Sequence, residues 1–393
     1  MVSETNNTLS DTNYDIAIIG AGPSGSTCAL ALGKTNLRVA LIDQASFPRE
    51  KTCGDAIAAY VPKVLNTISS QLKDDFLAFS KKYEVDTIRL YGNDNNPLDL
   101  TYKESGYIAK RIDLDHFLFK QADAVPNVTS HTNYKVSSIS KDEYGFTITN
   151  AKDSSKNIST KLVIGCDGAN GISRKYLDPI IKDNTHFAGA VRAYFKNVTG
   201  IPNKTFEIHF LKDLIPGYFW IFPLPNGESN VGLEMPTRNI SKRRVNLRNE
   251  MINIIEKHPI IKERFKNATQ LTDIKGAGLP LGSKKVSLSG EGYMFCGDAA
   301  YLIEPLTGEG IGQAIVSGRY AGWQAAECFE KQDFSATFLK KYDQTVYDKL
   351  WGDHKKRFNL RKAIEKHPYW FNNALNIMAD SDLVKTILKK VVL

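Results

Sequence analysis

The sequence predicts a mixed α/β fold in which a helix-covered parallel sheet is interrupted by an inserted antiparallel sheet. Three observations support this prediction. Residues 14–43 have the pattern of a strand, a helix and a second strand, a unit that builds parallel sheets. Short strand-like runs dominate residues 186–275, with a charged helix expected at 241–266. The α/β pattern returns near residue 293, and residues 335–393 are expected to be helical and basic.

The composition excludes several classes of protein. The chain has 393 residues, a formal net charge of +8 and a pI of about 9.0, a basic balance that suits nucleic acid, anionic membranes or phosphorylated ligands. No nucleic-acid-binding module is recognisable, so no nucleic-acid partner is expected. No apolar run is long enough to cross a membrane, and the polar residues 1–13 predict a disordered lead-in. The five cysteines lack C-x-x-C spacing, which predicts a reduced, cytoplasmic protein without a metal site.

A glycine-rich loop joins the first expected strand, YDIAIIG, to its helix. The loop residues expected to contact a dinucleotide are Gly20, Gly22, Pro23, Ser24 and Gly25. Gly22 lets the backbone approach a pyrophosphate, Gly25 lets the helix pack closely on the strand, and the helix N-terminus offers free N–H groups. Asp43 ends the second strand, where its carboxylate can accept hydrogen bonds from ribose hydroxyls. A glycine turn without a ligand would leave this terminal acid unexplained.

Two later segments each place an aspartate after a buried strand. The expected contacts are Asp167 and Gly168 in the first segment, and Gly297, Asp298, Pro305, Gly308, Gly310 and Ile311 in the second. Either aspartate can accept a hydrogen bond from a ribityl hydroxyl. The glycines at 308 and 310 open a helix whose N–H groups can meet the pyrimidine oxygen of a flavin, where reduction places negative charge. Taken alone, each segment is also compatible with an ordinary polar turn.

In this order, the motifs GAGPSG, IGCDGANGISR and FCGDAAYLIEPLTGEGI resemble those of FAD-dependent oxidoreductases with the para-hydroxybenzoate hydroxylase fold. The resemblance implies FAD as the cofactor and a discontinuous, Rossmann-like FAD-binding domain. It also implies that Arg111, which opens an R-x-x-L-D pattern, approaches FAD, although a surface arginine is an alternative. The expected domains are an FAD-binding domain of residues 14–84, 109–185 and 276–340, an antiparallel-sheet substrate domain of 85–108 and 186–275, and a helical C-terminal region, 341–393.

Two further segments resemble the geranylgeranyl reductase family. FPREKTCGD, residues 47–55, matches its P-x-x-K-x-C-G segment, and PGYFWIFPLPNGESNVGL, residues 216–233, matches its Y-x-W-x-F-P segment followed by V-G. The resemblance implies reduction of C=C double bonds in an apolar, isoprenoid-like substrate by hydride from N5 of reduced flavin. Only one dinucleotide fingerprint is present, so NAD(P)H would bind transiently, or a protein donor would supply the electrons.

The same two segments contain the candidate substrate and catalytic residues. Tyr218, Trp220 and Phe222 alternate along a strand and share one face, where they line either an apolar substrate channel or an ordinary core. By resemblance, Cys53 lies near the flavin ring. Lys51 could lower its thiol pKa and make it a proton donor or a reactive thiol, and a small residue that merely packs is the alternative.

Other functions remain open at this point. A flavin-dependent monooxygenase or halogenase could use the same scaffold, although the tryptophan segment of halogenases usually ends in Ile-Pro and Phe222 stands before the proline here. A non-catalytic FAD scaffold is a third alternative. The basic C-terminal tail predicts peripheral contact with an anionic membrane, or else a helix packed across the domain interface.

Overall fold

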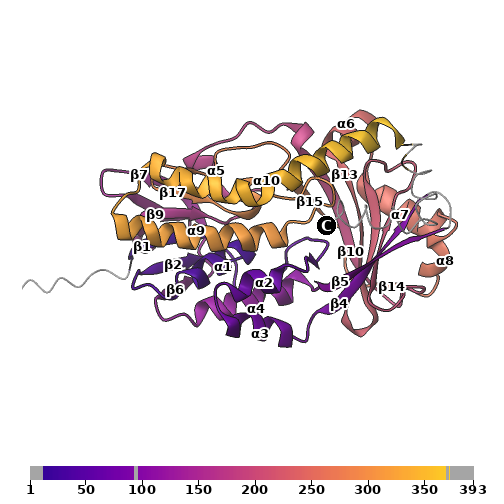
Figure 1. The fold of residues 1–393 in the computed structure, drawn as a ribbon, viewed down its shortest axis with the longest axis horizontal. Helices are drawn as coiled ribbons and strands as arrows, with labels where there is room; N and C mark the ends of the chain where they lie inside the picture. The colour runs from indigo at the N-terminus through magenta and orange to yellow at the C-terminus, as the bar shows by residue number, and fades with distance from the viewer. Residues whose placement is uncertain (1–11, 93–95, 369–370, 372–393) are drawn as a thin grey trace, which may run out of the picture.

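The computed structural model describes residues 12–92, 96–368 and 371, and it contains two sheets that lie side by side (Figure 1). The first sheet has the order β16-β17-β9-β1-β2-β6, and its β8 pairs with β9 and β7. β1, β2, β6, β9 and β17 are mutually parallel along that order. Their bounds are β1 Asn13–Ile19, β2 Val39–Ile42, β6 Val128–His131, β7 Val136–Lys141, β8 Phe146–Asn150, β9 Ile158–Gly165, β16 Ser289–Gly290 and β17 Tyr293–Phe295.

Both faces of the first sheet are covered, which explains the unbroken apolar run of its first strand. Ile16 and Ile18 of β1 pack against helices, whereas Ala17 and Ile19 pack against the β7–β8 hairpin. All four side chains are buried. The helices associated with this sheet are α1 Pro23–Ala31, α2 Val61–Asn66, α3 Ser70–Ala78, α4 Arg111–Asp123, α5 Ile172–Leu177, α9 Ile311–Lys331 and α10 Ala336–Lys366.

The second sheet has the order β14-β10-β13-β12-β11-β4-β5-β3, and β15 pairs with β10. The predicted antiparallel pairing holds for most of it, but β4 and β11 are parallel. β15 belongs to this sheet although the predicted boundary at residue 276 placed it elsewhere, and the other domain limits stay a prediction. Its bounds are β3 Ala56–Ile57, β4 Tyr83–Tyr91, β5 Leu98–Ile108, β10 Phe187–Lys196, β11 Thr205–His209, β12 Tyr218–Pro223, β13 Glu228–Pro236, β14 Thr269–Gln270 and β15 Lys275–Pro280.

The single charged helix predicted at residues 241–266 is wrong. The chain forms three short helices there, namely α6 Thr237–Arg243, α7 Leu247–Lys257 and α8 Ile261–Phe265. Arg244 takes a left-handed conformation with φ 54° and ends α6, and the Asn246 side chain caps the N-terminus of α7. Pro259 lacks an N–H group and separates α7 from α8.

The two faces of the second sheet have different roles. Val191 and Phe219 belong to the face that packs against α7 and α8. Tyr194 and Trp220 belong to the opposite face. Figure 1 shows this sheet beside the first one, with the long helix α10 running from one sheet to the other. The architecture therefore places the face of the second sheet that carries Tyr194 and Trp220 next to the carboxyl ends of the parallel strands in the first sheet.

The C-terminal prediction is tested only in part. α10 is helical as expected, and Phe371 packs on Phe210 with ring centroids 4.9 Å apart. Residues 372–393 of the basic tail, and the lead-in at residues 1–11, lie outside the described residues. Among the helices that the structure does describe, none has the length and apolarity to cross a bilayer.

Candidate active site

A cavity of about 1190 Å³ lies between the two sheets. It reaches the carboxyl ends of β1, β9 and β17, which are neighbours in the first sheet, so the three sequence motifs meet at one edge. The predicted residues that line it are Gly20, Gly22, Pro23, Ser24, Asp43, Cys53, Arg111, Asp167, Gly168, Tyr218, Trp220, Phe222, Asp298, Gly308, Gly310 and Ile311. Within the described chain, Gly25, Gly297 and Pro305 do not line it.

The glycine loop is shaped for a phosphate-bearing ligand. A Cβ added at Gly22 would lie 3.5 Å from one guanidinium nitrogen of Arg49 and 3.8 Å from one of Arg111, so two cations face the Gly22 backbone. Asp115 holds Arg111 through hydrogen bonds of 2.6 and 2.7 Å, and Arg49 bridges Asp115 and Asp43. This arrangement fits the negatively charged pyrophosphate of a dinucleotide.

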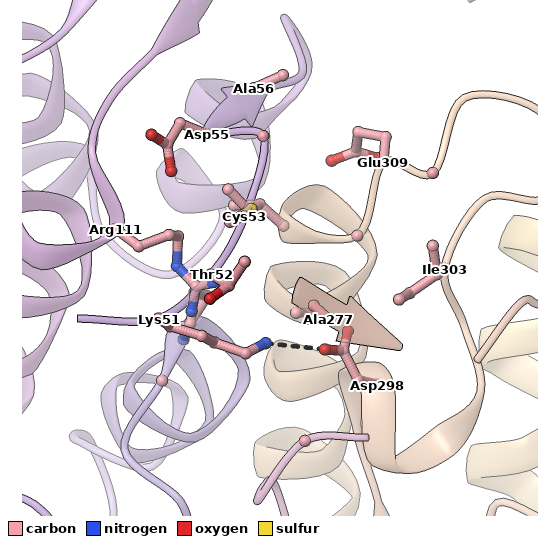
Figure 2. A pocket seen from close by; sticks show the side chains of 18 of the residues that line it. Lys51, Thr52, Cys53, Asp55, Ala56, Arg111, Ala277, Asp298, Ile303 and Glu309 are labelled. Carbon is pink, nitrogen blue, oxygen red and sulfur yellow. Dashed lines mark hydrogen bonds and ion pairs between the residues drawn. The ribbon is translucent and has the colours of Figure 1, made fainter. Parts of the chain in front are cut away.

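The two later aspartates have different surroundings. Asp167 accepts hydrogen bonds from the Ser173 backbone N–H, at 2.8 Å, and from the Ser173 hydroxyl. It therefore anchors the start of α5 as well as bordering the cavity. Asp298 accepts from Lys51 Nζ at 2.8 Å, a contact visible in Figure 2. Burial alone would raise the pKa of Asp298, but Lys51 and Arg111 hold it below its usual value.

The N-terminus of α9 forms the wall opposite Cys53. Gly310 is its N-cap and offers no capping side chain, so the first N–H groups of this helix other than that of Gly312 can meet a ligand oxygen. Glu309 lies at this end, facing the segment that carries Cys53 (Figure 2), and accepts from the Gly312 N–H at 2.7 Å. Burial raises the pKa of Glu309 to about 7. The predicted helix-terminus contact with a flavin oxygen is compatible with this wall.

Cys53 lies on the other wall, next to a buried aspartate. Asp55 Oδ2 accepts hydrogen bonds from Tyr194 Oη, at 2.7 Å, and Asn230 Nδ2, at 2.8 Å, and the same amide donates to the Cys53 carbonyl. Burial raises the Cys53 thiol pKa, and Arg111 and Lys51 offset only part of that rise. Lys51 does lower the thiol pKa as predicted, but it pairs with Asp298 and burial dominates, so the net shift of the Cys53 pKa is upward. The thiol stays protonated, which favours a proton donor over a reactive thiolate.

The aromatic residues of β12 both line the cavity and pack in a hydrophobic core, which were the two alternatives considered from the sequence. Tyr218, Trp220 and Phe222 line the cavity and belong to the core cluster on that face of the second sheet. Trp220 stacks on Phe222 with centroids 5.8 Å apart, and its indole N–H donates to Asn230 at 2.9 Å. Tyr218 donates to the Thr307 carbonyl. The three rings form a rigid, mostly apolar wall.

Sequence reasoning missed Arg49, Asp55 and Asn230. Arg49 and Asp55 stand within the FPREKTCGD segment, so an arginine and an aspartate near a candidate thiol were the available signal. Their partners come from distant parts of the chain, since Asp55 bonds residues 139 and 175 positions away. Asn230 carried no local signal.

The raised pKa of the buried Asp55 carboxyl predicts that the stability of the fold depends on pH. Burial raises its pKa from 3.8 to about 6, so the folded protein holds this proton more tightly than the unfolded chain. The free energy of unfolding therefore falls as the pH rises from about 4 to about 6, by about 3 kcal/mol from this group. Asp55→Asn keeps an oxygen for Tyr194 and Asn230 but removes the charge. Denaturant unfolding of the FAD-free protein should show the variant more stable than wild type at pH 8 and equal at pH 4. A difference that is the same at both pH values would contradict this assignment.

A family model described as an FAD binding domain matches residues 13–347. The chain belongs to this FAD-binding family. The predicted FAD cofactor and fold class are thereby confirmed, and contact between the glycine loop and FAD stays a prediction. The match covers both sheets, so the FAD-binding family accounts for the whole architecture around the cavity.

Relatives of this FAD-binding protein place it more narrowly. A digeranylgeranylglycerophospholipid reductase of Thermoplasma volcanium is 28% identical over 364 residues, covering 89% of this chain and 87% of the relative. The solved structure of a geranylgeranyl bacteriochlorophyll reductase-like protein of Thermoplasma acidophilum has a TM-score of 0.81 at 24% identity, with 95% of both chains covered. The flavin-dependent brominase Bmp2 has a TM-score of 0.77 at 21% identity, covering 97% of this chain and 93% of that one. The resemblance to the geranylgeranyl reductase family is confirmed by these relatives, and both structures show the shared fold.

Proposed function

We propose that this protein is an FAD-dependent reductase of C=C double bonds in an isoprenoid lipid. The carrying observation is the position of the Cys53 thiol, kept protonated by burial, in a cavity whose other side is the Tyr218–Phe222 aromatic wall. Full-length relatives include reductases of geranylgeranyl lipids. An apolar wall facing a proton donor suits an alkene better than a polar substrate.

The residues divide the work between cofactor and substrate. The Gly22 backbone, with Arg49 and Arg111, would hold the FAD pyrophosphate, and the N-terminus of α9 would meet the flavin ring. Bound FAD, reduced by NAD(P)H or a protein donor, supplies the hydride. Trp220 and its neighbours orient the prenyl chain and exclude water. Cys53 donates the proton to the second alkene carbon, and burial keeps that proton on sulfur until the substrate is in place.

The decisive test is an anaerobic single turnover. FAD on the protein is reduced with dithionite, and digeranylgeranylglycerophospholipid is added without oxygen. Reoxidation of the flavin with formation of a saturated prenyl chain is expected. Reoxidation only when oxygen is admitted, with an oxygenated product, would instead establish the monooxygenase alternative that the brominase-like fold keeps open.

Cys53→Ala should slow this alkene-dependent reoxidation by about 100-fold, the usual contribution of a positioned general acid. FAD content and the rate of reduction by dithionite should be unchanged. Cys328→Ala is the matched control, because Cys328 is buried in α9 away from the cavity lining. Wild-type turnover in Cys53→Ala would remove the thiol from the mechanism.

Peripheral membrane contact remains part of the proposal. A prenyl lipid resides in a bilayer, and residues 355–393 carry basic and aromatic side chains together. Sedimentation of the full chain and of a chain ending at residue 371, which keeps α10 and Arg361, with anionic liposomes would test this contact, and equal binding by both would exclude it.

A further inference from the structure

Arg192 is a buried cation without a partner in the cavity wall. Its side chain is 2% exposed, and among the described residues its Nε and Nη1 atoms have no hydrogen-bond acceptor. Arginine stays charged at any physiological pH, and a buried unpaired charge is strongly unfavourable. Arg192 also lines the cavity. A ligand anion is therefore the missing partner.

Neither neighbouring acid forms a hydrogen bond with Arg192 among the described residues. Glu50, which is within electrostatic reach of Arg192, bonds Lys275 at 2.5 Å. Asp55 is also within electrostatic reach. Its Oδ2 accepts from Tyr194 and Asn230, and its buried Oδ1 has no hydrogen-bond partner in the described part of the chain, so Asp55 attracts Arg192 without a hydrogen bond between them. Arg192 instead stacks on the Tyr194 ring, with its guanidinium carbon 4.1 Å from the centroid. The stacking holds the guanidinium in place without neutralising it.

Its position suits the head of a lipid rather than the tail. Arg192 stands opposite Lys275 in the β10–β15 register, and Lys275 and Glu50 are exposed, so this part of the wall lies near the cavity entrance. Lys110 approaches the same Tyr194 ring at 4.9 Å, but it is already ion-paired with Glu228, so Arg192 remains the cation offered to a ligand here. The aromatic residues Trp220 and Phe222 continue along the same face of the sheet.

We propose that Arg192 binds the phosphate of the lipid head group at the cavity entrance, with the prenyl chain lying along the Trp220 wall. This inference rests on the proposed function, since it names the polar part of that substrate. Phosphate is an anion that the planar guanidinium of arginine recognises well, through charge-assisted hydrogen bonds. Arg192 then selects phosphorylated prenyl lipids over neutral ones of the same chain.

The test compares two ligands that differ only in the phosphate. Geranylgeranyl monophosphate and geranylgeraniol are titrated into the FAD-loaded protein, and binding is followed by the flavin absorbance change. Wild type should bind the phosphate about 10- to 100-fold more tightly, the usual effect of a hydrogen bond to a charged group. Arg192→Gln should lose that preference and keep its affinity for the alcohol. Arg192→Lys should keep part of the preference, and Lys204→Gln, at an exposed lysine that pairs with Glu84 outside the cavity lining, should keep all of it.

Three results would overturn the proposal. One is an Arg192→Gln variant that keeps the preference or weakens both ligands equally. Another is loss of FAD from that variant, which would assign the side chain to the cofactor. The third is a variant that keeps the ligand preference but whose flavin is reduced more slowly by NADPH, though not by dithionite. That result would show that Arg192 binds a phosphate of NADPH. If wild type binds with the expected preference but reduces neither ligand, the reductase proposal fails while the Arg192 site stands.

Discussion

Gly25→Ala is expected to abolish FAD binding. A Cβ at residue 25 would lie 1.8 Å from the Gly20 carbonyl oxygen, far inside van der Waals contact, and that oxygen is backbone. The clash can be relieved only if α1 moves away from β1, which opens the loop that faces Arg49 and Arg111. The ratio of flavin to protein absorbance after purification should fall at least 100-fold, and the melting temperature should drop with it.

Gly352→Ala is the control for this prediction. Gly352 is an exposed position within α10, and a Cβ there meets no atom within 4 Å. The substitution should stabilise the helix by about 1 kcal/mol, because alanine has the higher helix propensity. A Gly25→Ala variant with wild-type FAD content would show that α1 and β1 can separate without disturbing the loop.

Arg361→Met should destabilise the fold by about 3–5 kcal/mol, the usual effect of removing one partner of a buried ion pair. Arg361 of α10 is 4% exposed and donates to Glu234 of β13, which is 1% exposed, and to the Pro305 carbonyl. Burial raises the pKa of Glu234 and Arg361 counteracts it, so the variant leaves Glu234 either charged and unpaired or forced to take a proton. Denaturant unfolding measures the loss.

Two further variants separate the ion pair from simple packing. Arg361→Met combined with Glu234→Gln should recover much of the stability, because no uncompensated charge remains. Lys341→Gln removes an exposed lysine of α10 that pairs with Glu327 of α9, and should change the free energy of unfolding by no more than about 1 kcal/mol. A double variant no more stable than Arg361→Met alone would show that the lost contacts of the arginine stem, rather than charge, explain the effect.

Local patterns predicted the parts of the fold that local physics determines. The βαβ unit at residues 14–43 appears as β1, α1 and β2, because an apolar run covered on both faces and a glycine loop are both readable over short distances. The motifs after β9 and β17 were readable for the same reason. The prediction of one helix at 241–266 failed because a left-handed Arg244 and Pro259 interrupt the helix. The charged composition on which that prediction rested does not reveal such interruptions.

The polar interior of the site was not predictable in the same way. Gly25 and Gly297 belong to the motifs yet pack behind the wall, because their task is to let backbone segments approach each other. Pro305 belongs to a motif too, but its carbonyl accepts a hydrogen bond from Arg361. The Asp55–Tyr194–Asn230 group depends on how two sheets are placed, and no single segment encodes that placement.

The Lys51–Asp298 ion pair joins residues 247 positions apart across the cavity. During synthesis the glycine loop leaves the ribosome early, but Asp298 and the helix that follows it emerge only after some three quarters of the chain has been made. A nascent or truncated polypeptide thus lacks half of the cofactor's enclosure, so stable capture of FAD must wait until translation is nearly finished. Retained yellow colour then reports that a molecule has been made at least through α9 and has folded.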